Sequence, residues 1–449
     1  MKTYQTFVFE SYKLDEITSQ LTLNYSLDQK EFFSEIITLP PFSTANLDLS
    51  ELESALFALH LIGGVSYFKT YCPSKISIKS GSLTKDQAEF WNNVYQKGLG
   101  EFFFQNNFDF RELIHFPAEA TSSVPPKTIA PKSISDLKLL VPYGGGKDSI
   151  VTTKLLKQQN LSLTLFRMGT HPVIDQLVKT AELPLITVER TLSPRLFELN
   201  KEDALNGHVP VTVYLSFLTI VVSLLYGFDA VVMSNERSAS YGNVTFHGME
   251  INHQWSKSLE SELALQNYIQ TYITNQVQYL NLLRPLSELH IAKIFTQYPY
   301  YFSQFTSCNT NWRILNKDRE ATGLWCGHCP KCAFIFSQLA AFLPLETVTE
   351  LFGKNLYNDP GLLPLYRQLL GIEGFKPFEC VGTPEETIAA FYLATQKDEY
   401  SNTLAGDLFK KEVLSTLDNP EELVHSLLTP EENYPILSLV SELIHNSRL

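Results

Sequence analysis

A triple glycine between an apolar segment and a helix-forming segment constrains this chain more than any other feature. Gly144, Gly145 and Gly146 follow the apolar residues 137–142 and precede a predicted helix over 149–160. Glycines let the backbone turn sharply and bring N–H groups close to a ligand, and the first turn of a helix adds its positive end. The loop therefore predicts an anion site suited to phosphate. The alternative is a plain glycine turn followed by a helix-capping residue.

Strands and helices alternate along the chain after this loop. Residues 161–169, 183–190 and 229–239 are predicted strands, the last of them ending in polar residues. A long apolar helix is predicted at 211–227. Such alternation indicates βαβ units and a parallel sheet, so the predicted fold class is α/β. Further helices are predicted at 258–280, at 286–297 and through most of the chain after residue 333.

Changes in composition divide the chain into four predicted segments. The first combines short alternating strands at 6–13 and 21–27 with an amphipathic helix at 52–61, which predicts an α+β domain. A segment rich in Pro, Ser and Thr follows and predicts a linker. The third segment carries the glycine loop and a cysteine cluster, and the last is predominantly helical. The predicted bounds are 1–117, 118–135, 136–345 and 346–449.

Composition and charge exclude several classes of function. The 449 residues include 35 Lys and Arg against 48 Asp and Glu, a formal net charge of −13. This balance argues against a nucleic-acid partner and against an anionic membrane surface. The apolar run 209–228 is nearly long enough to span a bilayer, but its Pro, Ser and Thr residues favour a buried helix and no membrane insertion. The N-terminal residues lack the apolar core of a signal peptide, so we expect a cytoplasmic protein.

Four of the six cysteines have the spacing of a metal site. Cys326, Cys329 and Cys332 form a double C-x-x-C run, and Cys308, with seventeen residues between it and Cys326, is a fourth candidate ligand. Four thiolates would complete the closed tetrahedral shell of structural Zn²⁺. An iron–sulfur cluster is the main alternative for four cysteine ligands. His328 could also replace one of the cysteines.

The glycine loop resembles the pyrophosphate loop of the PP-loop ATP pyrophosphatases, written S-G-G-x-D-S. Gly144 stands in place of the leading serine, whereas Gly145, Gly146, Asp148 and Ser149 match. The resemblance implies that ATP is cleaved between its α- and β-phosphates. It also implies that Gly145, Gly146 and Ser149 hold the pyrophosphate, that Asp148 lies near Mg²⁺ and that Lys147 offsets phosphate charge. The predicted nucleotide-binding residues are Tyr143, Gly144, Gly145, Gly146, Ser149, Glu236 and Arg237.

Further segments, in this order along the chain, narrow the resemblance. The segments that carry it, besides the loop and the cysteines, are 62–69, 234–239, 252–258 and 378–382. With them, the chain is similar to the UDP-N-acetylmuramoyl-L-alanyl-L-glutamate epimerase family over nearly its whole length. The cysteine arrangement also resembles that of 7-cyano-7-deazaguanine synthase, another PP-loop enzyme. The family resemblance implies inversion of the terminal L-Glu of UDP-MurNAc-L-Ala-L-Glu to D-Glu in peptidoglycan biosynthesis. It implies ATP and Mg²⁺ as requirements, an acyl-adenylate, and release of AMP and pyrophosphate.

This chemistry needs cations for phosphate and a base for the α-hydrogen. Lys69, Lys147, Arg237, Lys257 and Arg284 are the candidate cations. Glu236 ends a predicted parallel strand, where α/β proteins bind ligands, although it could simply pair with Arg237. His253 could donate to the acyl phosphate or shuttle protons, or be a structural histidine. Cys380 or Glu379 is the predicted epimerising base, with Cys72 a weaker candidate. The predicted catalytic residues are Asp148, Lys147, Glu379, Cys380 and His253.

Two other functions are compatible with the same motifs. One is a different PP-loop adenylating enzyme, such as a nitrile- or amide-forming ligase like 7-cyano-7-deazaguanine synthase, or a tRNA sulfur-transfer enzyme. The acidic net charge argues against a tRNA partner. The other is a non-catalytic nucleotide-binding module, against which the presence of both Asp148 and Lys147 argues. The oligomeric state is open at this level.

Overall fold

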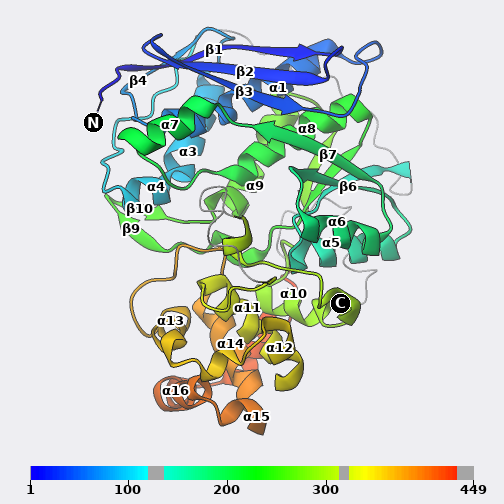
Figure 1. The fold of residues 1–449 in the computed structure, drawn as a ribbon, viewed down its shortest axis with the longest axis vertical. Helices are drawn as coiled ribbons and strands as arrows, with labels where there is room; N and C mark the ends of the chain where they lie inside the picture. The colour runs from blue at the N-terminus through cyan, green and yellow to red at the C-terminus, as the bar shows by residue number, and fades with distance from the viewer. Residues whose placement is uncertain (1, 120–135, 313–322, 432–449) are drawn as a thin grey trace.

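A nine-stranded mixed sheet runs through the computed structural model, which describes residues 2–119, 136–312 and 323–431 (Figure 1). Its strand order is β11-β8-β5-β6-β7-β3-β2-β1-β4. The predicted linker 118–135 lies almost entirely outside the described residues. The strands are β1 (Thr6–Asp15), β2 (Gln20–Leu27), β3 (Glu31–Thr38), β4 (Lys75–Ile78), β5 (Lys138–Pro142), β6 (Ser162–Met168), β7 (Leu185–Thr191), β8 (Ala230–Met233) and β11 (Gln278–Asn281). A separate ribbon pairs β9 (Val244–Phe246) with β10 (Met249–Ile251).

Five neighbouring strands form the parallel part of the sheet. β5 pairs with β6 on one side and with β8 on the other, while β7 and β11 extend the two flanks. After β7 the chain crosses back to β8, so the strand order reverses at β5. Such a reversal opens a crevice at the carboxyl ends of the strands, which is where open α/β sheets bind ligands. The glycine loop directly follows β5 and lies at this reversal point.

The N-terminal strands continue the same sheet in antiparallel fashion. β1, β2 and β3 form a meander, and β3 pairs with β7 through Ile36–Thr38. The predicted strands at 6–13 and 21–27 are confirmed. β3 and β4 were not predicted, because three of the eight β3 residues are exposed and β4 has only four residues.

Alternating side chains give the parallel strands two buried faces. Leu140, Phe166 and Val231 contribute to the core on the face that also packs the N-terminal helices. Leu139 and Val232 contribute to the opposite core, which extends into the C-terminal helices. Strands buried on both faces are typical of parallel sheets, so the short apolar runs of the sequence indicated this arrangement correctly.

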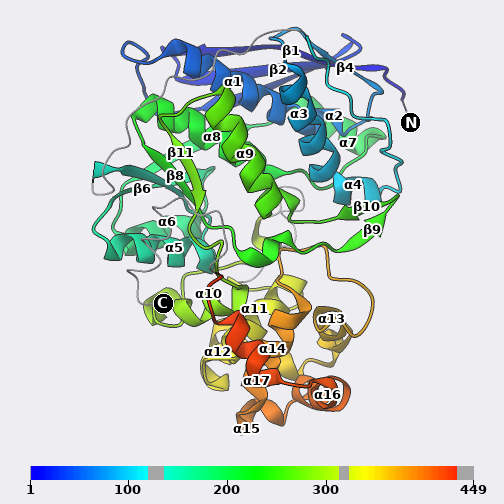
Figure 2. The ribbon, with the colours of Figure 1, turned by 180° about the vertical axis from the view of Figure 1, so that it is seen from behind.

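Helices cover both faces of the sheet (Figures 1 and 2). The predicted apolar helix is α8 (Val211–Tyr226), which is buried along most of its length and ends at Gly227 in the left-handed conformation. It packs against α1 (Leu49–Gly63), the predicted N-terminal helix. No helix among the described residues has the length and apolar character needed to cross a membrane. The other helices up to the cysteine cluster are α2 (Val65–Phe68), α3 (Lys85–Gly98), α4 (Gly100–Gln105), α5 (Lys147–Gln158), α6 (Pro172–Ala181), α7 (Pro194–Glu202), α9 (Leu259–Tyr272) and α10 (Glu288–Phe295).

The helix predicted over 258–280 is wrong over its last eight residues, 273–280. α9 ends at Tyr272, and the chain then enters β11, which pairs with β8 in parallel. Without β11, β8 would be a free edge of the sheet. Pairing with β8 satisfies the backbone groups of residues 278–281, which a longer helix would have bonded internally. The neighbouring prediction at 286–297 agrees with α10.

A helical layer lies beyond the carboxyl ends of the parallel strands, at the opposite end of the molecule from the N-terminal meander (Figure 1). It confirms the predicted helical C-terminal region for the described residues; the end of that region, 432–449, lies outside them. Its helices are α11 (Pro330–Ala340), α12 (Leu345–Phe352), α13 (Leu363–Leu369), α14 (Pro384–Thr395), α15 (Asp398–Ser401), α16 (Leu404–Glu412) and α17 (Pro420–Leu427).

Candidate functional site

The glycine loop presents an open surface at the carboxyl end of β5. A Cβ atom added at Gly144 would meet no atom within 4 Å. Gly145 has a φ of 83°, which side-chain-bearing residues rarely adopt, and Gly146 is the N-cap of α5. The Ser149 hydroxyl donates to the Gly146 carbonyl at 3.0 Å, while Tyr143 is buried and anchors the loop through its backbone N–H on Phe166 O at 2.8 Å. The loop thus combines a rigid turn with free space above it.

Three carboxylates converge beside this loop. Asp148 comes from the first turn of α5, Glu236 follows β8, and Glu288 is the first residue of α10. One oxygen from each lies within 4.8 Å of the others. Burial and the neighbouring charges of Glu288 and Asp148 raise the pKa of Glu236 to about 7. Because β8 is parallel to β5, Glu236 and the glycine loop lie at the same edge of the sheet.

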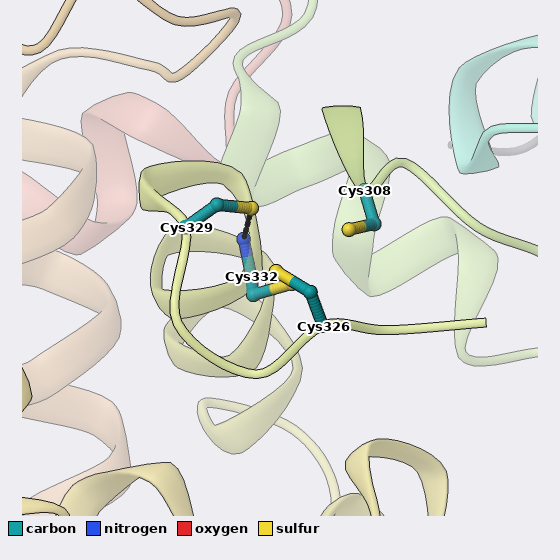
Figure 3. Close-up of side chains that lie close together, drawn as sticks. All are labelled: Cys308, Cys326, Cys329 and Cys332. Carbon is teal, nitrogen blue, oxygen red and sulfur yellow. Dashed lines mark hydrogen bonds between the residues drawn. The ribbon is translucent and has the colours of Figure 1, made fainter. Parts of the chain in front are cut away.

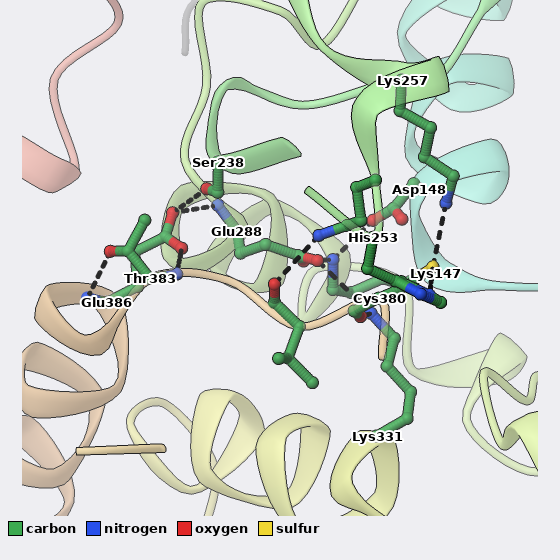
Figure 4. A network of polar contacts seen from close by, with 12 residues as sticks. Lys147, Asp148, Ser238, His253, Lys257, Glu288, Lys331, Cys380, Thr383 and Glu386 are labelled. Atoms are coloured by element: carbon green, nitrogen blue, oxygen red, sulfur yellow. Dashed lines mark hydrogen bonds and ion pairs between the residues drawn. The ribbon is translucent and has the colours of Figure 1, made fainter. Parts of the chain in front are cut away.

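Two buried lysines neutralise part of this acidic cluster (Figure 4). Lys147 donates to Asp148 at 2.5 Å and also pairs with Glu288. Lys331, in the first turn of α11, lies 3.4 Å from the other Glu288 oxygen. Burial opposes ionisation of Glu288, but Lys147 and Lys331 lower the pKa of this carboxyl to about 2. We expected Lys147 to offset phosphate charge; in the structure its ammonium pairs with the carboxylates of Asp148 and Glu288.

The C-terminal layer holds Glu288 in place. Glu386, a buried residue in the first turn of α14, accepts from the backbone N–H of Glu288 at 2.8 Å and also from the Ser238 hydroxyl. Thr383 and Glu386 form a reciprocal capping box at the start of α14. The helical layer and the sheet thus contribute to one site (Figure 4).

A second polar group surrounds Cys380 on the loop before α14. The Cys380 sulfur lies 3.4 Å from Lys257 Nζ and 3.7 Å from His253 Nε2. The other ring nitrogen of His253 lies 2.5 Å from Glu101 Oε2. Burial opposes ionisation of Cys380, but Lys257 and His253 lower the pKa of its thiol to about 5. Burial likewise opposes protonation of His253, but Cys380 and Glu101 raise its pKa to about 9.

Lys331 joins the two groups. Its ammonium donates to the Cys380 carbonyl while it faces Glu288. The predicted residues Lys147, Asp148, His253 and Cys380 therefore lie in one connected polar region (Figure 4). Glu236 adjoins it through Asp148 and Glu288. Glu379 is half-buried next to Cys380 in the chain.

Other predicted cations have different surroundings. Arg237 does not pair with Glu236, and instead lies 3.7 Å from Glu431 beside the C-terminal segment. Arg284 is buried, pairs with Glu262 at 2.7 Å and donates to two backbone carbonyls. Lys69 donates to Asn206 at 2.8 Å. Cys72, the weaker candidate base, is buried, and burial raises the pKa of its thiol to about 12.

The four predicted metal-ligating cysteines come together in space (Figure 3). The sulfurs of Cys308, Cys326, Cys329 and Cys332 all lie within 4.8 Å of one another. Cys326 and Cys332 are 3.7 Å apart, and the sulfur of Cys329 caps α11 by accepting from the Cys332 N–H at 3.4 Å. The ring of His328 is exposed and lies 2.9 Å from the Cys326 carbonyl, outside this set.

Glu288, Lys331 and Glu101 were missed at the sequence level. Ser287 and Glu288 gave only the signal of a helix start, and Glu101 lies in an aromatic segment with no motif. Lys331 lies between Cys329 and Cys332, and the spacing of the cysteines gives no signal for a role of the lysine. Each becomes recognisable only through the partner that the fold brings to it.

Comparison with known proteins identifies the family. Residues 1–282 match the family described as the MurL N-terminal domain, and residues 304–422 match the MurL C-terminal domain. The chain belongs to the MurL family. Among its relatives, the UDP-N-acetyl-alpha-D-muramoyl-L-alanyl-L-glutamate epimerase of Xanthomonas oryzae pv. oryzae is 37% identical over 433 residues, which cover 96% of this chain and 95% of that protein.

Two further MurL relatives carry the same name. The protein from a Micromonospora species is 38% identical, with 89% of each chain covered. The protein from Salinispora tropica is 39% identical, with 88% of this chain and 85% of that protein covered. The family resemblance inferred from the motifs is thereby confirmed.

Proposed function

We propose that this protein is an ATP-dependent epimerase that converts the terminal L-Glu of UDP-MurNAc-L-Ala-L-Glu to D-Glu, in peptidoglycan biosynthesis. Three relatives carry the name of this epimerase, and this chain matches most of the length of each. The observation that carries the mechanism is the connection through Lys331 of an anion-binding edge to a cysteine–histidine pair. The edge at the glycine loop can bind a nucleotide, and the pair of Cys380 and His253 can move a proton.

The reaction needs activation because a free carboxylate resists loss of its α-hydrogen. The resulting carbanion would lie beside a negative charge. Forming an acyl-adenylate removes that charge and lets the electron pair spread onto the carbonyl oxygen. Proton removal followed by delivery to the opposite face inverts the centre, and hydrolysis then releases the product with AMP and pyrophosphate.

ATP fits the glycine loop as the activating substrate. The free space above Gly144, the N-terminus of α5 and the strand reversal at β5 favour a phosphate chain at this edge. In our proposal Gly145, Gly146 and Ser149 hold the pyrophosphate and Lys147 offsets its charge. This arrangement is that of a PP-loop nucleotide site.

The acidic cluster beside the loop fits Mg²⁺. Oxygen ligands are what this ion prefers, and Asp148, Glu236 and Glu288 offer three of them within 4.8 Å. Burial and, after it, the negative charges of Glu288 and Asp148 raise the pKa of Glu236. A divalent cation would offset these negative charges and would supply charge neutralisation for the phosphates.

The cysteine cluster fits one structural zinc ion. A tetrahedral site with Zn–S bonds of about 2.3 Å places its sulfurs about 3.8 Å apart. The separation of 3.7 Å between Cys326 and Cys332 agrees with this value, and the 4.8 Å limit on all four sulfurs favours one ion over a multinuclear cluster. The ion would hold the segment of Cys308 against the start of α11.

We assign substrate recognition to the N-terminal part of the chain, residues 1–117, because the MurL relatives contain it as well. Glu101 and α4 bring this part to the Cys380 region. A nucleotide-linked precursor and ATP both occur in the cytoplasm, and we propose this compartment for the reaction.

Incubation with ATP, Mg²⁺ and UDP-MurNAc-L-Ala-L-Glu tests the proposed function. We expect AMP, pyrophosphate and a product whose terminal residue is D-Glu by chiral analysis after hydrolysis. UDP-MurNAc-L-Ala, which lacks the glutamate, is the matched control and should yield no AMP. ATP binding without turnover would support a nucleotide-binding module instead, and AMP formation without D-Glu would indicate another adenylating reaction.

A further inference from the structure

Three side chains converge at the loop that carries Cys380. Glu101 belongs to α4, His253 follows the β9–β10 ribbon, and Lys257 lies just before α9. Figure 4 shows Lys257 and His253 approaching the sulfur of Cys380. Glu101, His253 and Cys380 are arranged like an acid that orients a base, with the base next to a nucleophilic thiol.

Hydrogen bonds hold the imidazole of His253 in one orientation. Glu101 Oε2 lies 2.5 Å from Nδ1, which directs Nε2 toward the Cys380 sulfur at 3.7 Å. The ring of His208 lies beside that of His253, with centroids 4.7 Å apart, and His208 Nδ1 is 3.4 Å from the same Glu101 oxygen. Burial lowers the pKa of His208 well below its usual value, so this neighbour is neutral and leaves Glu101 to His253.

Asn243 links the backbone segment of His253 to the loop that carries Cys380. Asn243 accepts from the His253 N–H at 2.8 Å and donates through its side-chain amide to the carbonyls of Lys376 and Pro377 at 2.9 Å. Gln254 also donates to Val381 O at 3.0 Å. These hydrogen bonds join the loop of Cys380 to the segment of His253.

The groups that face the sulfur are predominantly cationic. Lys257 and His253 are its direct neighbours, and Lys331 and Lys376 add positive charge from α11 and from the same loop. Glu101 lies behind His253, and Glu379 precedes the cysteine in the chain. This environment favours a thiolate over a thiol, consistent with the lowered pKa of Cys380.

We propose that Cys380 is the base that removes the glutamate α-proton and that Glu101 is a positioning residue, acting through His253, that keeps this sulfur ionised. The inference rests on the proposed function. The C–H bond breaks, its proton goes to the sulfur, and its electron pair moves onto the oxygen of the adenylated carboxyl. The electron pair then returns to the α-carbon, which takes a proton of solvent origin on the opposite face, and the Cys380 thiol gives its proton back to solvent, so that protons balance over the turnover. Glu379 is then not required as the base.

Alkylation measures the ionisation of Cys380 independently of turnover. The full-length protein is treated with iodoacetamide over a series of pH values, and mass spectrometry of peptides follows the peptide that contains Cys380. We expect the rate to have reached its plateau at neutral pH in the unmodified protein. In Glu101→Gln the midpoint should move upward by about one pH unit or more, since a carboxylate stabilises the imidazolium by this order.

The conservative variant and a matched control separate positioning from folding. Glu101→Asp keeps the charge and should restore part of the shift, while Cys72→Ser should alkylate at Cys380 like the unmodified protein. Circular dichroism checks that each variant is folded, and His253→Asn provides a second way to remove the imidazolium if Glu101→Gln does not fold. An unchanged midpoint in a folded Glu101→Gln or His253→Asn protein would refute the positioning role.

Proton exchange tests the base itself. In D₂O with ATP, Mg²⁺ and the muramyl dipeptide, Cys380→Ser should lose α-deuterium uptake by about 100-fold or more, the usual contribution of a general base. Glu379→Gln is measured in the same way: loss of uptake there, with normal uptake in Cys380→Ser, would assign the base to Glu379 instead. Normal uptake in Cys380→Ser would overturn the assignment. Substrate-dependent AMP formation is measured in parallel: its absence in the unmodified protein would refute the proposed function, whereas its presence with normal uptake in Cys380→Ser would refute only this inference.

Discussion

At the scale of single residues, the three glycines of the loop serve different purposes. Gly145 needs its positive φ, and a Cβ at Gly146 would lie 3.0 Å from the Ser307 hydroxyl. Gly144 has neither constraint, because its φ is not positive and the space around it is open. The free surface at Gly144 is therefore available for a ligand and is not needed by the fold.

Gly144→Ala separates folding from nucleotide binding. We expect the free energy of unfolding to change by no more than about 0.5 kcal/mol, as for a surface substitution. ATP affinity should fall roughly tenfold, since overpacking costs about 1–3 kcal/mol. Calorimetric titration with ATP and urea unfolding measure the two quantities. Gly145→Ala is the control and should destabilise the fold; unchanged ATP affinity in Gly144→Ala would contradict a phosphate site at this position.

His60 predicts a pH dependence of stability. Its ring is buried between Ser80 and the carbonyl of Asn24, and burial lowers its pKa from 6.5 to about 4. The unfolded chain therefore binds the proton first as the pH falls. The stability contributed by the neutral ring is complete above pH 6.5 and is lost toward pH 4, by about 3 kcal/mol.

Urea unfolding at a series of pH values measures this loss. His60→Gln should be less stable at neutral pH but should lose much less stability between pH 6.5 and pH 4. His115→Gln, which changes an exposed histidine, should retain the slope of the unmodified protein. An equal slope in His60→Gln would show that other groups cause it.

At the scale of elements, a buried charged network joins the antiparallel meander to the parallel strands. Glu35 of β3 is fully buried and accepts from Arg190 of β7 at 2.8 and 3.0 Å. Tyr67 of α2 and Tyr214 of α8 donate to the same carboxylate at 3.0 and 2.8 Å. Four elements therefore depend on one carboxylate where the sheet changes direction.

Glu35→Gln should lower the free energy of unfolding by about 3–5 kcal/mol, because it leaves the Arg190 charge without its partner. Replacing both Glu35 and Arg190 with Met should recover much of that loss. Arg195→Met breaks a more exposed pair between α7 and Glu31 of the same strand and should cost about 1 kcal/mol or less. Urea unfolding measures all three. A small effect of Glu35→Gln would mean that water reaches this network.

At the scale of the whole molecule, the cysteine cluster and the nucleotide edge share one segment. The Thr306 N–H donates to the Gly145 carbonyl at 3.2 Å, and Ser307 lies against Gly146. The next residue, Cys308, is one of the four clustered cysteines. A metal at this cluster would therefore hold the glycine loop from behind, and the helical layer would support ATP binding in the sheet.

Metal removal should affect both regions. We expect about one equivalent of zinc by elemental analysis, and its removal by a chelator should lower Tm and weaken ATP binding at least about fivefold, within the usual range of coupling between sites. Cys308→Ser should reproduce both effects. Cys72→Ser, which changes a cysteine outside the cluster, should retain metal and ATP affinity. Normal ATP binding by a metal-free, folded protein would show that the two regions are independent.

Local sequence determined much of this protein. The apolar runs with glycines between them predicted the parallel strands and the buried α8, because burial and backbone freedom depend on residue type. The spacing of Cys326, Cys329 and Cys332 predicted a cluster, since neighbouring ligands reach one point within a short turn. Long-range pairing was beyond such reasoning, so β11 was mistaken for the end of a helix.

Only the tertiary structure decided which distant side chains share a site. Glu101 reaches His253, Glu288 reaches Lys147, and Arg237 lies beside Glu431 instead of Glu236. Contacts of this kind depend on how strands cross and how helices pack, and no local residue pattern encodes them. The residue types and their spacing specified the chemistry that was available, whereas the sheet and the helical layer specified which groups can act together.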